Sequence, residues 1–169
     1  MEFKLKTISK AGIPEAITKA ELYRSLNEPE EAESICCDIL AVEPEHQLAL
    51  RLLGLAITDQ FCGDGSDRHG EVGSLFHRLS ANYERLYYMG LLHERRAKAQ
   101  MRMGHPLHSL APLFVEAMRC FADAELIHPP DNDDAVLRWN RCARLLQSHP
   151  GFQEDRESAA FDAMDTSPI

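Results

Sequence analysis

Residues 109–130 read SLAPLFVEAMRCFADAELIHPP, and this stretch decides the fold class. Its apolar residues recur at intervals of three and four positions, which is the spacing of one face of an α-helix. They are Leu110, Leu113, Phe114, Ala117, Met118, Phe121 and Ala124. We expect Ser109 to cap the helix, with Pro112 at the third position, and His128-Pro129-Pro130 to stop it. The stretch therefore predicts one long amphipathic helix.

The helical period extends outward from this stretch, and no segment alternates with the period of two that a β-strand requires. We expect further helices at residues 13–26, 29–43, 46–61, 82–103 and 133–148, and a short helical piece from Leu75. The last helix is expected to bury Val136, Trp139, Ala143 and Leu146. The glycine-rich residues 62–74 are expected to form an exposed insertion loop. The chain is therefore predicted to be all-α.

Composition limits the class of protein. With 169 residues, 44% of them hydrophobic and 27% charged, the sequence suits a single domain, which we place at residues 1–149. No apolar run approaches the length of a membrane span, and the lysine-rich start lacks the apolar segment of a signal peptide. The net charge of −9 argues against nucleic acid as the partner. Five cysteines, with Cys36 and Cys37 adjacent, indicate reduced thiols and a cytoplasmic protein.

The charge is unevenly distributed. Residues 1–72 hold 7 Lys/Arg and 14 Asp/Glu, residues 73–149 hold 10 and 8, and residues 150–169 hold 1 and 5. We expect the acidic segment 150–169 to be a disordered tail. The basic stretch around Arg95, Lys98 and Arg102 is either a solvated helix face or a groove wall that meets an acidic peptide.

An internal repeat relates two of the expected helices. Ala32, Cys36, Ile39 and Pro44 recur 85 residues later as Ala117, Phe121, Ala124 and Pro129. Earlier helices carry Ala20 with Tyr23, and Leu53-Gly54 with Ile57. This pattern resembles the tetratricopeptide repeat, with the match over residues 13–61 and 109–148. The resemblance implies stacked antiparallel helix pairs in a short superhelix, closed by a capping C-terminal helix.

The same resemblance implies a binding function. Tetratricopeptide repeats act mainly as scaffolds that hold a protein or peptide in a groove lined by the first helix of each pair. The matching positions here are Ile17, Glu21, Arg24, Leu48, Arg51, Leu55, Asn140 and Arg144. The lysine–asparagine clamp of members that bind chaperone tails does not carry over, because Ile17 and Glu21 stand at its positions. We therefore expect an adaptor and no enzyme.

The last helix offers a contact surface of its own. Arg138, Arg141 and Arg144 follow one another at intervals of three, and residues 135–149 contain no acid. Arginine forks suit carboxylate or phosphate partners, so an acidic ligand is expected here, either from a partner or from the chain's own tail.

Two alternatives to the adaptor remain open. The first is a small helical enzyme, dependent on a metal or a thiol, that uses His105, His108 and a cysteine such as Cys120. A zinc site needs three or four convergent ligands, and only two histidines lie close in sequence, so we expect no metal and no cofactor. The second alternative is an oligomeric structural protein in which residues 62–74 or 82–103 form a contact between copies.

Overall fold

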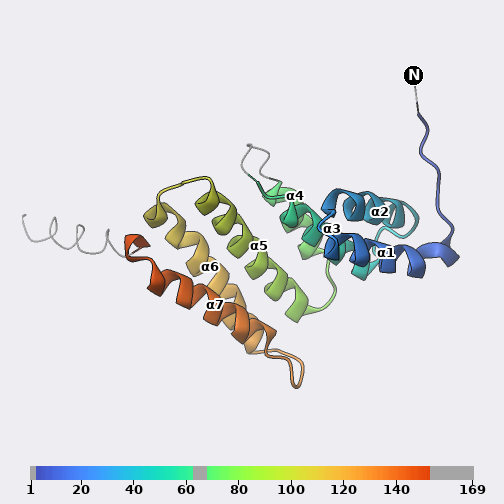
Figure 1. Cartoon of the computed structure of the whole chain (residues 1–169). Helices are drawn as coiled ribbons and strands as arrows, with labels where there is room; N and C mark the ends of the chain where they lie inside the picture. The colour runs from blue at the N-terminus through green and yellow to red at the C-terminus, as the bar shows by residue number, and fades with distance from the viewer. Residues whose placement is uncertain (1–2, 63–67, 153–169) are drawn as a thin grey trace, which may run out of the picture.

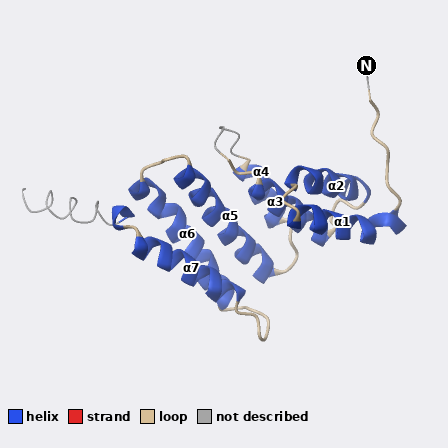
Figure 2. Ribbon diagram, in the orientation of Figure 1, coloured by secondary structure: helices blue, strands red, loops and turns tan. Residues whose placement is uncertain are grey.

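The computed structural model describes residues 3–62 and 68–152. Its described residues form helices and connecting segments without a strand, as Figure 2 shows, and this confirms the all-α prediction. The helices are α1 (Ile13–Ser25), α2 (Pro29–Val42), α3 (Gln47–Asp59), α4 (His69–His77), α5 (Asn82–Arg102), α6 (Leu107–Glu125) and α7 (Asp134–Ser148). Short 3₁₀ turns at Lys10–Gly12 and Pro150–Phe152 flank them.

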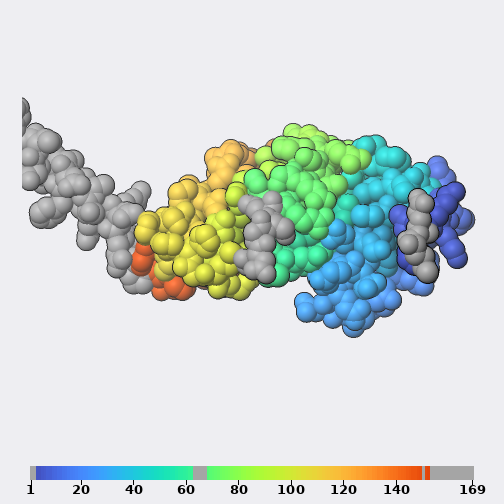
Figure 3. Space-filling view, turned by 90° about the horizontal axis from the view of Figure 1, so that it is seen from above, coloured from blue at the N-terminus to red at the C-terminus, as the bar shows by residue number. Residues whose placement is uncertain are grey.

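Each helix packs on the next one along the chain, and the α5–α6 interface is the most extensive (Figure 1). Alternate helices also meet, because α1 contacts α3, α3 contacts α5, and α5 contacts α7. We call α1, α3, α5 and α7 the odd-numbered layer. In the space-filling view the chain progresses from one end of the molecule to the other, from blue α1 and α2 to orange α7 (Figure 3).

Two apolar clusters stabilise the array, and α5 belongs to both. The first joins α1–α4 with Leu92 of α5, and the second joins α6 and α7 with Ala97 of α5. The repeat residues Ala32, Cys36 and Ile39, and likewise Ala117, Phe121 and Ala124, are fully buried. Both sets therefore lie on the packed faces of α2 and α6.

Two helices approach their neighbours closely at glycines. A Cβ atom on Gly54 would lie 2.3 Å from Cε1 of Phe76 in α4, and one on Gly90 would lie 2.7 Å from Cε1 of Phe121 in α6. Both aromatic rings are fully buried. Glycine at these positions lets α3 meet α4, and α5 meet α6, at a distance that no side chain would permit.

Two helices end in a residue with positive φ. Asn27 follows α1 with φ of 62°, and Gly104 follows α5 with φ of 82°. In each case the next amide donates back into the last turn, from Glu28 to the Tyr23 carbonyl at 2.9 Å and from His105 to the Gln100 carbonyl at 3.1 Å. This is the Schellman arrangement, which satisfies carbonyls that the helix end leaves free.

Two expected boundaries are wrong. Helix α4 begins at His69, so the loop expected at residues 62–74 is too long, although residues 63–67 lie outside the described part. Val72, Leu75 and Phe76 are buried, and this packing outweighs the low helix propensity of Gly70 and Gly73.

The expected cap of α6 is also wrong. The helix begins at Leu107, two residues before Ser109, and Pro112 lies inside it. The Ser109 hydroxyl donates to the Pro106 carbonyl at 2.7 Å instead of accepting from a helix amide. Pro106 has ψ of 132°, which is extended backbone, so the helix starts directly after it.

The buried face of α7 differs from the expected one. Ala135, Cys142 and Leu145 are buried, whereas Trp139 is 37% exposed. The expected stripe of Val136, Trp139, Ala143 and Leu146 is therefore displaced by about one residue. The reason is that Arg138 shares the inward face, where it meets a buried carboxylate of α5.

Candidate functional site

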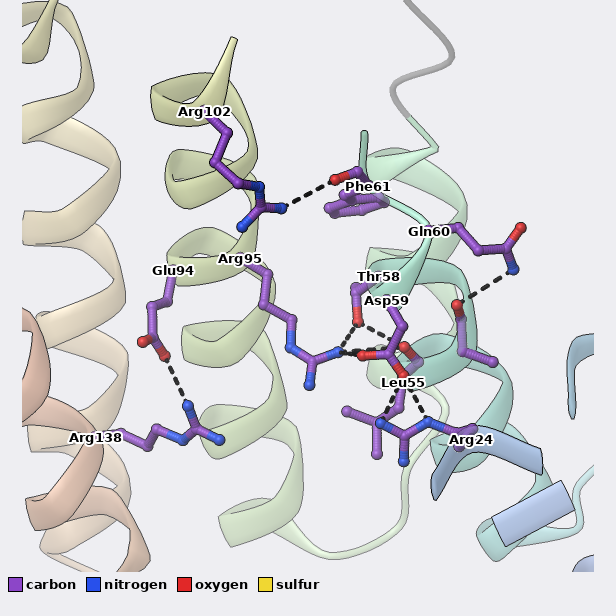
Figure 4. Close-up of polar contacts among 11 residues, drawn as sticks. Arg24, Leu55, Thr58, Asp59, Gln60, Phe61, Glu94, Arg95, Arg102 and Arg138 are labelled. Carbon is purple, nitrogen blue, oxygen red and sulfur yellow. Dashed lines mark hydrogen bonds and ion pairs between the residues drawn. The ribbon is translucent and has the colours of Figure 1, made fainter. Parts of the chain in front are cut away.

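Ion pairs connect the helices of the odd-numbered layer (Figure 4). Arg24 of α1 donates from Nε to Oδ2 of Asp59 in α3 at 2.7 Å. Arg95 of α5 meets the other carboxylate oxygen of Asp59, so one carboxylate joins three helices. Arg138 of α7 then lies 3.6 Å from Glu94 of α5. We call these five residues, together with Arg51, Glu84, Lys98 and Arg102, the ion-pair ladder.

Helix geometry positions the ladder. Glu94 and Lys98 are four residues apart and pair along one face of α5. The neighbouring Arg95 points toward α3, where its Nη1 also donates to the Thr58 hydroxyl at 2.6 Å and the Leu55 carbonyl at 3.3 Å. Glu94 and Arg95 therefore make α5 the centre of the ladder, with α7 on one side and α3 on the other.

Two further cations extend the ladder to both ends of α5. Arg51 of α3 pairs with Glu84 at 3.0 Å, and its guanidinium lies 6.0 Å from the centre of the Tyr88 ring. At the other end, Arg102 donates to the Phe61 carbonyl at 3.2 Å. Five cations thus pair with three carboxylates within the ladder, and the sixth, Arg102, contacts a backbone carbonyl.

The charged side chains of the ladder are buried to different extents. Glu94 is fully buried, and the side chains of Arg24 and Arg95 are 21% and 24% exposed. Burial lowers the pKa of the Arg95 guanidinium, with Asp59 opposing this effect and Arg24 adding to it. Arg95 is therefore a partly desolvated cation that shares its carboxylate with a second cation.

A hollow of about 330 Å³ lies beside the ladder, where α5 begins. Arg51, Glu84 and three tyrosines of α5 contribute to its wall, together with residues of the α6–α7 connection. Tyr83 and Tyr87 stack with ring centres 5.8 Å apart. The Tyr83 hydroxyl donates to Oδ1 of Asn132 at 3.1 Å, and burial raises its pKa to about 12. The hollow therefore combines aromatic faces with the cation of Arg51 and the carboxylates of Glu84 and Asp134.

The structure distributes the sequence-predicted groove residues over different environments. Ile17 and Leu55 are buried, so their side chains belong to the packing, although the Leu55 carbonyl accepts from Arg95. Arg24 and Arg51 belong to the ladder. The other α1 and α3 candidates, Glu21 and Leu48, are exposed.

The sequence-predicted site residues on α7 also lie in different environments. Arg138 is half-buried in the ladder, Asn140 is half-buried, and Arg141 and Arg144 are exposed. The three arginines therefore do not act as one arc. Asp59 and Glu94 were not predicted as site residues. Arg95 belongs to the basic stretch that the sequence left open as a solvated face or a groove wall.

The histidine and thiol candidates do not meet as the enzyme alternative requires. His105 and His108 are exposed. His108 and Cys120 lie on the same helix, α6, twelve residues apart, which corresponds to about 18 Å along its axis. None of the five cysteines is in a disulfide, and burial raises the pKa of Cys36 and Cys142 to about 12.

Comparisons with family models, curated proteins and solved structures find no match to this chain. Of the helices that the structure describes, none combines the length and the apolar character that crossing a membrane requires. The ladder and the adjoining hollow are therefore the candidate site on geometric grounds alone.

Proposed function

We propose that this chain is a scaffold that binds an acidic segment of another protein across the odd-numbered layer. The observation that carries the proposal is the excess of cations in the ladder. Arg24 and Arg95 share Asp59, and Lys98 and Arg138 share Glu94, in a chain whose net charge is −9. Such a local excess favours a ligand that brings further carboxylates.

Arginine is suited to this role because its planar fork can hold two carboxylates at once. Exposed charge pairs each contribute about 0–1 kcal/mol, so several must act together and the binding should weaken with salt. The ladder supplies cations from all four helices of the layer, which gives an extended ligand successive points of contact.

The hollow at the start of α5 supplies the apolar part of the recognition. Tyr83, Tyr87 and Tyr88 present aromatic surface next to Arg51. Tyrosine gives a large contact area for little loss of side-chain entropy, and such residues often dominate binding energy. We propose that one apolar or aromatic side chain of the ligand enters this hollow while its acidic neighbours meet the ladder.

The sequential helix pairs α1/α2, α3/α4 and α5/α6 support a tetratricopeptide-like reading in which α7 is the cap. On that reading the first helices of the pairs, α1, α3 and α5, line the groove together with α7. The proposal therefore keeps the groove inferred from the sequence resemblance and adds α5 to it.

Fluorescence anisotropy with labelled peptides tests the proposal. A peptide rich in Asp and Glu with one central Phe should bind, and the same peptide with Lys in place of the acids should not. Arg24→Gln and Arg95→Gln should each weaken binding by up to about five-fold and reduce its salt dependence. Each variant leaves Asp59 with its other arginine, so this carboxylate never loses both partners.

Arg119→Gln is the matched control, since it makes the same charge change on α6, outside the odd-numbered layer. Equal weakening by Arg119→Gln, or equal binding of the lysine peptide, would show that the ladder recognises no ligand.

A further inference from the structure

A second group of side chains, none of which belongs to the ladder, converges between α5 and α6. His93 of α5 and Glu116 and Cys120 of α6 each offer one ligand atom, and these atoms all lie within 4.8 Å of one another. Glu116 and Cys120 are four residues apart, so they project from the same face of α6. His93 reaches them across the α5–α6 interface.

The His93 ring has a buried nitrogen, Nδ1, that makes no hydrogen bond with the described residues. A buried polar atom without a partner is uncommon and calls for an explanation, of which an absent ion is one. Imidazole nitrogen, carboxylate oxygen and thiolate sulfur are together the ligand types that Zn²⁺ prefers.

We propose that His93, Glu116 and Cys120 form a zinc-binding site that joins α5 to α6. In a tetrahedral site with bonds of about 2.0–2.3 Å, ligand atoms lie about 3.5 Å apart, so the three side chains must close by about 1 Å. Rotation of side chains at a helix surface supplies this movement. Cys120 binds as the thiolate and releases its proton to solvent.

We propose His69 as the fourth ligand only after its side chain moves toward the site, since it lies outside the group of atoms that are within 4.8 Å of one another. It is the first residue of α4, and its ring centre lies 6.4 Å from that of His93. The ion would then connect three consecutive helices, α4, α5 and α6.

The neighbouring charged side chains influence the affinity of the proposed site for zinc. Arg119 donates to Glu116 from Nη2 at 2.6 Å and from Nε at 3.1 Å, and Arg96 and Asp123 also lie nearby. Each carboxylate oxygen keeps a second lone pair for the metal, and ligating carboxylates commonly hold such a second partner. Arg119 still repels a cation, so Arg119→Gln should strengthen zinc binding by a few-fold.

Spacing along the chain does not indicate this site, because its ligands come from different helices. The pair His105 and His108, which is close in sequence, is exposed and does not belong to the group. The expectation that the chain lacks a metal site rested on sequence spacing, and the proposal replaces it.

Titration of the metal-free protein with Zn²⁺ and Co²⁺ tests the proposal. We expect one Zn²⁺ per chain by calorimetry, a rise of several degrees in melting temperature, and a cobalt spectrum with the thiolate charge-transfer band and intense tetrahedral bands. Cys120→Ser should remove the charge-transfer band, and Cys120→Ser, His93→Gln and His69→Gln should each lower zinc affinity at least ten-fold.

Three controls keep the result specific. Cys142→Ser changes another buried thiol, and the double variant His105→Gln/His108→Gln changes the exposed histidines; both should bind zinc as the parent does. Circular dichroism of each variant before titration shows that it is folded. A parent protein that binds no zinc, or a folded Cys120→Ser variant that retains the parent's cobalt spectrum, would overturn the proposal.

Discussion

Glu94 is a fully buried carboxylate at the centre of α5, and Lys98 and Arg138 are the cations that meet it. A buried charge is tolerated only when it is paired, because removal from water strongly disfavours an isolated ion. The position of Arg138 on the inward face of α7 follows from this requirement. Arg138 therefore has a structural role that the exposed Arg141 and Arg144 do not share.

Replacing Arg138 should consequently be more harmful than replacing its neighbours. We expect Arg138→Ala to lower the free energy of unfolding by about 1–3 kcal/mol, since Glu94 keeps only Lys98. Arg141→Ala, on the exposed face, should change it by less than about 0.5 kcal/mol. Urea denaturation of the two variants compares them directly, and equal stabilities would mean that the Glu94–Arg138 pair contributes nothing.

Ala117 is a second residue whose position is informative, because the atoms around it leave no room for a larger side chain. It is fully buried, and its carbonyl oxygen lies 3.1 Å from where a Cβ atom on Gly90 would be. We expect Ala117→Leu to destabilise the protein by about 1–3 kcal/mol, because the extra atoms would push α5 and α6 apart. Val115, on the same helix, is 59% exposed, so Val115→Leu is the control. An unchanged melting temperature of Ala117→Leu would contradict the close α5–α6 contact.

At the scale of elements, Arg68 connects α2 to α4. Its Nη2 donates to Oε1 of Glu33 in α2 at 2.7 Å, and its Nε donates to Oε2 of Glu71 in α4 at 2.8 Å. Gln60, which follows α3, donates to the same Glu33 at 2.6 Å. The side chains of Arg68 and Glu33 are 32% and 20% exposed, so this contact is only partly screened by solvent.

This connection should make stability depend on pH. The hydrogen bond from Arg68 holds the pKa of Glu33 below its usual value of 4.5, against the opposing effect of burial. A lowered carboxyl pKa in the folded state contributes stability above pH 4.5 that is lost as the pH falls through the folded value.

We therefore expect Arg68→Gln to lower the melting temperature at pH 7 by about 2–4 °C, which corresponds to about 1 kcal/mol for a chain of this size. The difference from the parent should shrink as the pH falls below 4.5. Scanning calorimetry across this range checks the expectation, with Arg141→Gln as the control for charge. A difference that stays constant with pH would exclude Glu33 as its source.

At the scale of the whole molecule, the acidic residues 153–169 could compete with an acidic ligand for the odd-numbered layer. These residues lie outside the described part of the chain and carry Glu154, Asp155, Glu157, Asp162 and Asp165. A tethered acidic segment competes at high effective concentration with a separate ligand. We therefore expect removal of these residues to strengthen the binding of a separate acidic ligand.

Truncation tests this competition, and the structure indicates where to cut. Phe152 packs edge-on against Phe114 with ring centres 5.7 Å apart, so the deletion should begin at Gln153. We expect the truncated chain to bind the acidic peptide more tightly, with a difference that disappears at high salt. The control is a full-length chain in which the five tail acids become Asn or Gln, and it should match the truncated one. Unchanged affinity in both would show that the tail does not reach the ladder.

Patterns among residues close together in the sequence were enough to predict much of the fold. The period of three and four located most of the helices, and the apolar residues at the 85-residue offset are buried, whereas the two prolines are exposed. Helix location depends on a residue and its neighbours in the chain. Burial of the small residues depends on their being small enough for a close contact between helices. The errors at His69 and Trp139 arose where contacts between helices outweighed local preference, and the error at Leu107 arose from the extended backbone of Pro106.

The sequence by itself determined that this chain is helical, where most of its helices lie, and that it carries a basic stretch within an acidic whole. Only the tertiary structure decided which charges meet. Arg24, Asp59, Arg95 and Arg138 are far apart in sequence, and so are His69, His93 and Cys120. Helix periodicity fixes which face of its own helix a residue occupies, but not which residue lies opposite on the next helix. That depends on the packing of apolar faces and on the close contacts at Gly54 and Gly90.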